Sequence, residues 1–188
     1  MTRGEVRERA ILQAVTELLG EVGYQALTMD AVAARARASK ATIYRRWRNK
    51  AELVKAALDA YDSEFNLVIR DTGELRGDLV AVLEALRDKA TDEYLGMLNA
   101  LIAAARYDTE LAAALHEHTE DEELSPFAAS LDRAVARGDL PADVDGTLVH
   151  DVAEAMILRQ LTVGLPLDDA FVTRVVDDVL LPLLPTNS

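Results

Sequence analysis

Apolar residues recur at intervals of three and four positions along most of the chain, which is the spacing of an amphipathic helix. The first such run begins at Glu5, and Gly23 is placed to end it because glycine adopts positive φ at no steric cost. The apolar positions of this run are Ile11, Ala14, Val15, Leu18, Leu19 and Val22. No stretch of the sequence has the pattern of a sheet strand. The pattern therefore predicts an all-α fold.

A second, shorter helix is predicted over about residues 29–36. Thr28 precedes it and supplies the hydroxyl of an N-cap. Leu27 and Val32 flank that cap at the two positions of a hydrophobic staple.

Two further capping signals follow closely. Ser39 can cap a third helix, whose fourth residue Ile43 faces the core, and Asn49 with Glu52 opens a fourth helix that runs toward Phe65. Two short helices joined by a turn of about three residues, inside a three-helix module, form the helix-turn-helix arrangement.

A polar, glycine-bearing break, RDTGELRG at residues 70–77, separates this module from the rest of the chain. Beyond it the pattern predicts helices at about 75–92, 94–106, 109–118, 121–137, 145–163 and 168–184. The expected protein has nine to ten helices in two domains: a helix-turn-helix domain over residues 1–55 and a helical domain over residues 56–188.

Charge is distributed unevenly between these two parts. The net charge is −13, which by itself argues against a polyanionic partner. However, residues 1–55 carry 11 Lys/Arg and 6 Asp/Glu, a balance of +5, whereas residues 56–188 carry 9 and 27, a balance of −18. Such asymmetry indicates that the basic part meets a polyanion and the acidic part has another task.

The segment SKATIYRRWRNK, residues 39–50, concentrates five positive charges and two large aromatics. At about 100° per residue, Ile43 and Trp47 share the core-facing side of the third helix. Small Ala41 and Arg45 then centre the opposite side, where a guanidinium can fork onto guanine in a major groove. Candidate DNA contacts are Thr28, Ser39, Lys40, Ala41, Thr42, Tyr44, Arg45, Arg48 and Lys50. The alternative is a basic face that is merely solvated.

Residues 8–58 resemble the DNA-binding module of the TetR family of bacterial transcriptional regulators. The matching features are the Gly23–Tyr24 pair, Thr28, Ala33, Ala36, Ser39, Ile43, Tyr44, an aromatic at position 47, Lys50 and Leu53. The resemblance implies an all-helical homodimer with paired modules on a palindromic operator, and a C-terminal domain that dimerises and usually binds a small effector.

This chain departs from the family pattern in three places. Arg37 stands where glycine is usual in the turn, Ala38 where valine is usual, and Trp47 where phenylalanine is common. Arg37 must then adopt the turn without the freedom of glycine, and its side chain becomes a further candidate phosphate contact.

The last two predicted helices carry an apolar surface that is broad for a helix packed on one side only. Two such helices from each subunit would form a four-helix dimer interface, which is the arrangement that the resemblance implies. The expected interface residues are Val149, Val152, Met156, Phe171, Val172, Val175, Val176 and Val179. Burial of these side chains within a single subunit is the alternative.

Methionines, aromatics and a few polar groups on the middle helices are the candidates for an effector pocket. They are Tyr94, Met97, Leu98, Leu101, Arg106, Tyr107, His116, Phe127 and Met156. Packing in the core is the alternative for the apolar members, and solvent exposure is the alternative for Arg106 and His116.

Several classes of function are disfavoured. The chain has no cysteine, which excludes disulfides and thiolate chemistry, and no catalytic triad or glycine-rich phosphate loop appears, so no enzyme and no cofactor are expected. The acidic segment HEHTEDEE, residues 116–123, fixes no third metal ligand and is expected to be an exposed surface. No apolar run or signal peptide is present, so a cytoplasmic protein without membrane contact is expected.

The sequence thus predicts a dimeric repressor that a small-molecule effector releases from a palindromic operator on double-stranded DNA. An activator or an effector-independent regulator is an alternative within the same class. A helical protein-interaction module, or less readily a helical enzyme, is the alternative from a different class.

Overall fold

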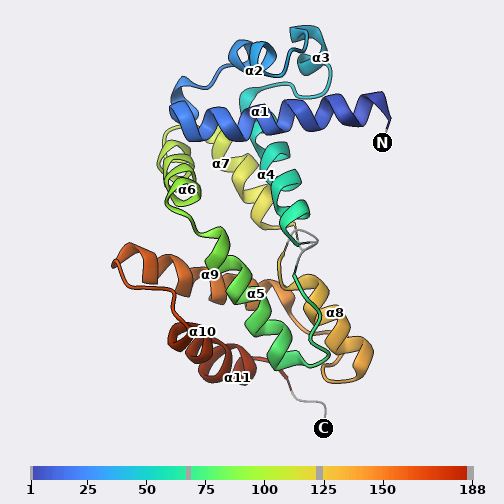
Figure 1. Cartoon of the computed structure of the whole chain (residues 1–188), viewed down its shortest axis with the longest axis vertical. Coiled ribbons are helices and arrows are strands. Elements are labelled where there is room, and N and C mark those ends of the chain that lie inside the picture. Colours follow the sequence, from blue (N-terminus) through green and yellow to red (C-terminus); the bar gives the residue numbers. More distant parts are fainter. Residues whose placement is uncertain (1, 67–68, 122–124, 186–188) are drawn as a thin grey trace. The chain divides into compact units, whose positions relative to one another are not determined.

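The computed structural model describes residues 2–66, 69–121 and 125–185, and in these ranges the regular structure is entirely helical, with no strand. The helices are α1 (Arg3–Ala26), α2 (Met29–Arg35), α3 (Lys40–Tyr44), α4 (Lys50–Asn66), α5 (Leu75–Lys89), α6 (Asp92–Ala105), α7 (Thr109–Thr119), α8 (Ala128–Arg137), α9 (Gly146–Thr162), α10 (Asp169–Val175) and α11 (Leu181–Leu183), with a π-helical turn over Val176–Leu180 (Figure 1). The all-α prediction is confirmed.

The chain forms two compact units. The first comprises Met1–Glu64 and Ala90–Thr119, and so holds α1 to α4 together with α6 and α7; the second comprises Phe65–Lys89 and Glu120–Ser188. Each unit has its own apolar core. The predicted boundary at residue 55 separates functions rather than compact units, and it stays a prediction.

In the first unit, α1 lies between the α2–α3 pair on one side and α6 on the other (Figure 1). Its apolar face is buried from Ile11 to Leu19, but Val22, which was expected to share that face, is 49% exposed. Gly23 then changes the chain direction with φ 72° and ψ 171°, a region that is almost restricted to glycine. The positive φ expected at Gly23 is confirmed, but Gly23 does not end the helix, which extends to Ala26 beyond this bend.

The second unit packs α5, α8, α9 and the last helix around a core that includes Phe127, Leu83 and Leu180, all at most 2% exposed. α8 begins at Ala128 rather than at residue 121. Residues 122–124, which fall in the predicted helix, lie outside the described residues.

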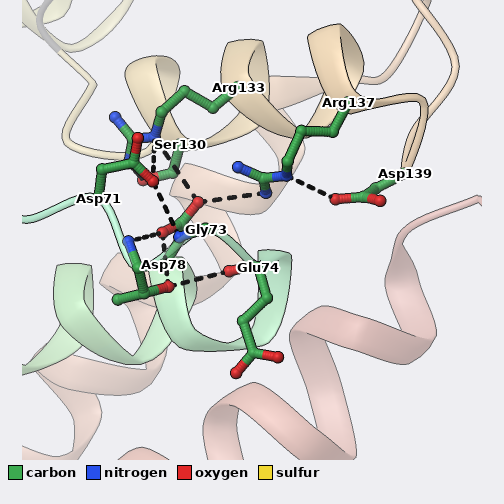
Figure 2. A network of polar contacts seen from close by, with 9 residues as sticks. Asp71, Gly73, Glu74, Asp78, Ser130, Arg133, Arg137 and Asp139 are labelled. Carbon is green, nitrogen blue, oxygen red and sulfur yellow. Dashed lines mark hydrogen bonds and ion pairs between the residues drawn. The ribbon is translucent and has the colours of Figure 1, made fainter.

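A buried carboxylate joins α5 to α8 within the second unit (Figure 2). The Asp78 side chain is fully buried and accepts hydrogen bonds from the backbone N–H and the hydroxyl of Thr72, both at 2.8 Å. From α8, Arg137 donates to it at 3.3 Å, and Arg133 lies 3.6 Å away. Burial raises the pKa of Asp78, but the Thr72 hydrogen bonds and the two guanidinium groups outweigh burial and bring the pKa below its ordinary value.

The last helix is continuous from Asp169 to Leu183, as predicted, but it contains one π-helical turn. At the end of that turn the N–H of Leu181 donates to the carbonyl of Val176, five residues back. Pro182 follows directly and has no N–H to continue an α-helical ladder. No helix in the described part of the chain combines the length and apolar character needed to cross a bilayer.

Candidate nucleic-acid interface

The start of α2 is fixed by the cap that the sequence predicts. The Thr28 hydroxyl accepts a hydrogen bond from the N–H of Ala31 at 3.1 Å, and Leu27 and Val32 are both buried on either side of it. Thr28 itself is exposed. The cap and the hydrophobic staple are therefore confirmed, and they hold the N-terminus of α2 toward solvent.

The turn between α2 and α3 is a Schellman motif with arginine at its left-handed position. Arg37 has φ 50°, its N–H donates to the carbonyl of Ala34, and the N–H of Ala38 donates to the carbonyl of Ala33 at 3.0 Å. The prediction that Arg37 adopts the turn without glycine is confirmed. The backbone strain is the cost of placing a guanidinium there.

Ser39 caps α3 as predicted, accepting from the N–H of Thr42 at 3.2 Å. Ile43 is fully buried and Trp47 is 8% exposed, whereas Ala41 and Arg45 are exposed. The two opposite faces predicted for this segment are therefore present.

The α-helix itself is shorter than the projection assumed, because α3 ends at Tyr44. The N–H of Trp47 still donates to the carbonyl of Ile43 at 3.0 Å, which keeps the next turn close to helical. Arg48 lies beyond this turn, so its place on the edge of the α3 face is revised: its side chain pairs with Glu52 of α4 at 2.8 Å.

The cations on and next to the α2–α3 segment fall into two groups, those paired with a carboxylate and those without one. Lys40 is paired with Asp30 at 2.6 Å, which raises the pKa of Lys40, and Arg46 is paired with Glu8. Across the described ranges, neither Arg37 nor Arg45 has a carboxylate partner, and both are exposed. The charge available to a phosphate or a base edge is therefore concentrated on these two arginines.

Lys50 is the first residue of α4, as predicted, but its ammonium is engaged within the chain. Its ammonium donates to the carbonyl of Tyr24 at 2.9 Å and lies 3.9 Å from the centroid of the Tyr24 ring. Burial lowers the pKa of Lys50, although Asp108 opposes the shift. The phosphate contact predicted at this position stays a prediction for the backbone N–H groups that begin α4, and it no longer rests on the ammonium.

Sequence reasoning missed the acidic and aromatic partners that occupy these cations. The basic groups that remain free are decided by Asp30, Glu52 and Tyr24. The sequence pattern had not indicated that any of these three would hold a cation. The four-residue spacing of Arg48 and Glu52 was a usable signal. Nothing local links Tyr24 to Lys50, which are 26 positions apart.

The predicted effector residues belong to both units. In the first unit Met97 and Leu101 are core residues, Tyr94 stacks on Tyr61 with ring centroids 5.7 Å apart, and Tyr107 is 90% exposed. Leu98 is half-buried, and Arg106 and His116 are exposed.

The other two effector candidates belong to the second unit. Phe127 is fully buried and Met156 is half-buried. For Met97, Leu101 and Phe127 the core alternative holds, because their side chains are already enclosed by their own unit.

The structure contains an open groove that the sequence did not predict, between α1 and α4. It has a volume of about 750 Å³, an apolar floor that includes Leu12 and Tyr61, and a rim that includes Glu5, Glu17 and Glu64. These carboxylates already have partners within the chain: Glu5 accepts from the N–H of Thr2, Glu17 pairs with Arg35, and Glu64 pairs with Arg9.

The predicted dimer residues divide by exposure. Phe171, Val172, Val175 and Val176 are at most 4% exposed, because they pack into the core of their own unit. Val149 is also buried, at 1%. For these five side chains the single-subunit alternative holds, and their place in an interface is corrected. A place in the dimer interface stays a prediction for the half-buried Val152, Met156 and Val179.

The acidic segment at residues 116–123 was expected to be exposed, but its His118 side chain is only 13% exposed. Among the described residues no cluster of His, Asp and Glu is suited to a metal ion. His118 instead contacts Asp59 and Asp62 of α4. Glu122 and Glu123 lie outside the described residues.

Comparison with known proteins agrees with this geometry. Residues 11–57 match the family described as bacterial regulatory proteins, tetR family, and residues 69–179 match the family described as tetracyclin repressor-like, C-terminal domain. Together the two matches cover most of the chain.

Full-length relatives carry the same description. The chain is 53% identical to the DNA-binding transcriptional repressor TetR of Mycobacteroides abscessus, over 98% of this chain and 97% of that protein. It is 35% identical to an uncharacterized HTH-type transcriptional regulator of Mycobacterium bovis, over 97% of this chain and 90% of that protein.

Solved structures share the fold. The crystal structure of the TetR family transcription regulator SCO0332 superposes with a TM-score of 0.73 at 33% identity, covering 95% of this chain and 99% of that one. The chain therefore belongs to the TetR family and is a DNA-binding transcriptional regulator.

Proposed function

We propose that the protein is a homodimeric repressor, acting in the cytoplasm, that binds a palindromic operator and is released from it by a small-molecule effector. The observation that supports this most directly is the two-faced α3 segment. Ile43 and Trp47 are buried, so Arg45 and the 51% exposed Tyr44 are held outward on a braced support. The relative from Mycobacteroides abscessus is named a repressor, which favours repression over activation.

Arg45 is the proposed base-reading residue. It is exposed, has no carboxylate partner in the described residues, and follows Ala41 by one helical turn. The small side chain of Ala41 lets the backbone approach the major groove, and the guanidinium can donate two hydrogen bonds to O6 and N7 of guanine.

Phosphate contacts would surround this central contact. Thr28 and Ser39 mark two exposed helix starts, and Tyr44 can donate its hydroxyl to a phosphate. Arg37 has no carboxylate partner in the described part of the chain, whereas Lys40 must exchange Asp30 for a phosphate. These contacts set the register of the module on the duplex and carry no sequence information themselves.

A dimer is needed because a palindrome presents two half-sites, about 34 Å apart when they lie one helical turn from each other. The half-buried residues Val152, Met156 and Val179 on the last two helices support an interface there, joined by Leu148, which is 44% exposed. An effector would act by favouring a conformer in which the two α3 segments no longer match successive grooves.

The test begins with selection of bound fragments from random DNA by the purified protein. On the enriched duplex, the affinity of the wild type should fall steeply with salt, since counterions are released when phosphates are bound. Arg45→Ala should cost about 1–3 kcal/mol at defined base pairs. The matched control is Arg174→Ala, which removes an exposed cation from α10.

Each part of the proposal has its own contrary result. An equal loss for Arg45→Ala on every sequence would reduce Arg45 to a phosphate contact. Binding by a monomer would defeat the dimer, and the absence of any small molecule that releases the duplex would defeat the effector.

A further inference from the structure

Helix α7 is attached to α1 near its first turn and to α4 near its other end. These two helices precede and follow the α2–α3 segment, whose exposed residues Thr28, Arg37, Tyr44 and Arg45 form the proposed DNA-reading surface. Near its first turn, the Tyr24 hydroxyl donates to one carboxylate oxygen of Asp108 at 3.0 Å. The other oxygen of Asp108 accepts from the N–H of Leu111 at 3.0 Å and so caps α7. The Leu111 hydrogen bond is the main cause that lowers the pKa of Asp108, against the effect of burial.

Tyr24 is a corner of the DNA-reading module. It follows the bend at Gly23, precedes Thr28 by four residues, and holds the ammonium of Lys50 with its carbonyl and ring. A displacement of Tyr24 would therefore move both the entry to α2 and the start of α4.

The second attachment is at the other end of α7. Nδ1 of His118 lies 2.7 Å from a carboxylate oxygen of Asp59, and Nε2 lies 3.4 Å from one of Asp62, both on α4. The His118 side chain is only 13% exposed. Lys55 pairs with Asp59 at 2.8 Å from the same helix.

Burial lowers the pKa of His118, but the hydrogen bonds and charges of Asp59 and Asp62 outweigh it and raise the pKa to about 9. The ring is therefore a cation at neutral pH, with both N–H groups available to the two carboxylates. Among the described residues, these two carboxylates are the groups that raise the pKa of the ring, and Lys55 pairs with one of them, Asp59.

The two attachments are matched in spacing. From Asp108 to His118 the chain advances about 15 Å along α7, and from Lys50 to Asp59 it advances about 13 Å along α4, at about 1.5 Å per residue. α7 thus runs beside α4 in the same direction, and both attachments can hold without bending either helix.

We propose that α7 is a strut that fixes the DNA-reading surface, with Tyr24 and His118 as positioning residues for operator binding. The inference rests on the proposed DNA-reading surface and adds to it the helix that holds it in place. A helix attached at one end can swing, whereas one attached at both ends fixes α4 against the Tyr24 corner.

The probe is a fluorescein-labelled duplex enriched from random DNA by the wild type, followed by anisotropy at fixed ionic strength and at a temperature where circular dichroism shows every variant folded. Tyr24→Phe removes only the hydroxyl, and His118→Gln removes the charge. Each should weaken binding roughly 5- to 20-fold, in line with the coupling between residues of one network. Glu117→Gln, on an exposed position of α7, should bind as the wild type does.

Two further measurements separate a strut from ordinary stabilisation. The double variant should lose less affinity than the product of the two single losses, because a strut released at one end is already free. Between pH 7 and 9.5 the affinity of the wild type should fall toward that of His118→Gln, whose own affinity should change much less. The control Arg70→Gln also removes one positive charge but keeps His118, so its affinity should fall with pH as that of the wild type does.

Several outcomes would overturn the strut. Folded single variants that bind within twofold of the wild type would limit both contacts to stability, and losses that multiply would make them independent. If the wild type enriches no sequence from random DNA, this result contradicts the proposed base reading by Arg45 and not the strut. The same variants are then compared on random-sequence duplex at low salt, where losses of the same size are still expected of the strut.

Discussion

In the first unit, three successive helices begin at Thr28, Ser39 and Asn49, and each of these side chains accepts a hydrogen bond from an N–H three residues further on. In the second unit, α5 is held at Asp78, whose carboxylate is wholly buried and whose partner Arg137 lies 59 positions away. The DNA-reading module is thus shaped by signals within the length of one turn, while the second unit depends on a distant charge pair. The first kind of signal can be read from sequence and the second cannot.

The largest expected effect is in the second unit. Asp78→Ala leaves Arg133 and Arg137 without their buried carboxylate and should lower the free energy of unfolding by about 3–5 kcal/mol. Urea denaturation followed by circular dichroism measures the loss. Asp177→Ala, which removes an exposed pair with Arg76, is the matched control and should have a small effect.

Trp47 sharpens this measurement, since it is the single tryptophan of the chain and lies in the core of the first unit. Its fluorescence transition should move little in Asp78→Ala if the two units unfold separately. Equal shifts in both signals would show that the units unfold as one.

Next in size is Gly23→Ala in the first unit. A methyl group at Gly23 meets no atom within 4 Å, so the loss comes from the backbone alone, at φ 72° and ψ 171°. We expect about 1–3 kcal/mol of destabilisation, read from Trp47 fluorescence. Gly96→Ala, within α6 and equally open, should instead stabilise by about 0.5–1 kcal/mol. A loss at both positions would mean that added volume, not φ, is responsible.

The His118 contact makes the stability of the first unit depend on pH. Because the pKa of His118 is raised to about 9 in the folded chain, its contribution is complete below about pH 6.5, the unfolded pKa, and is lost as the pH rises through 9. The wild type should lose about 1–2 kcal/mol between pH 6.5 and 9.5, while His118→Gln changes much less. Parallel curves for the two proteins would assign the dependence to other groups.

The smallest expected effect is at the turn before α3. Arg37→Gly relieves a left-handed arginine and should stabilise the module by about 0.5–1 kcal/mol. The same change removes a candidate phosphate contact, so the slope of log affinity against log salt should become shallower by about one per module. Thermal denaturation and a salt titration measure the two effects. A gain in stability with an unchanged slope would remove Arg37 from the DNA contacts.

The sequence predicted most helices and the outward face of α3 because caps, staples and apolar spacing act over three to five residues. Thr28 and Ser39 cap helices as their positions predict, and Gly23 has the positive φ expected of it. Even the turn at Arg37 followed from the resemblance to the family, because the backbone there must be left-handed whatever the side chain.

What failed depended on partners distant in the chain. The breadth of the apolar surface on the last helix suggested a dimer contact, yet Phe171 and Val175 are enclosed by their own unit, and periodicity cannot tell these two environments apart. In the same way, the sequence could not show that the Lys50 ammonium is engaged by Tyr24, which leaves only the backbone N–H groups at the start of α4 for the predicted phosphate contact. Whether a charged or apolar side chain is free is a property of tertiary structure.

The pairing of Lys40 with Asp30 and of Arg48 with Glu52 has a consequence for how the protein searches a genome. Cations already neutralised by the chain release few ions on random DNA, so sliding encounters should be brief and sequestration by bulk chromosome slight. The operator alone would repay the exchange of those partners.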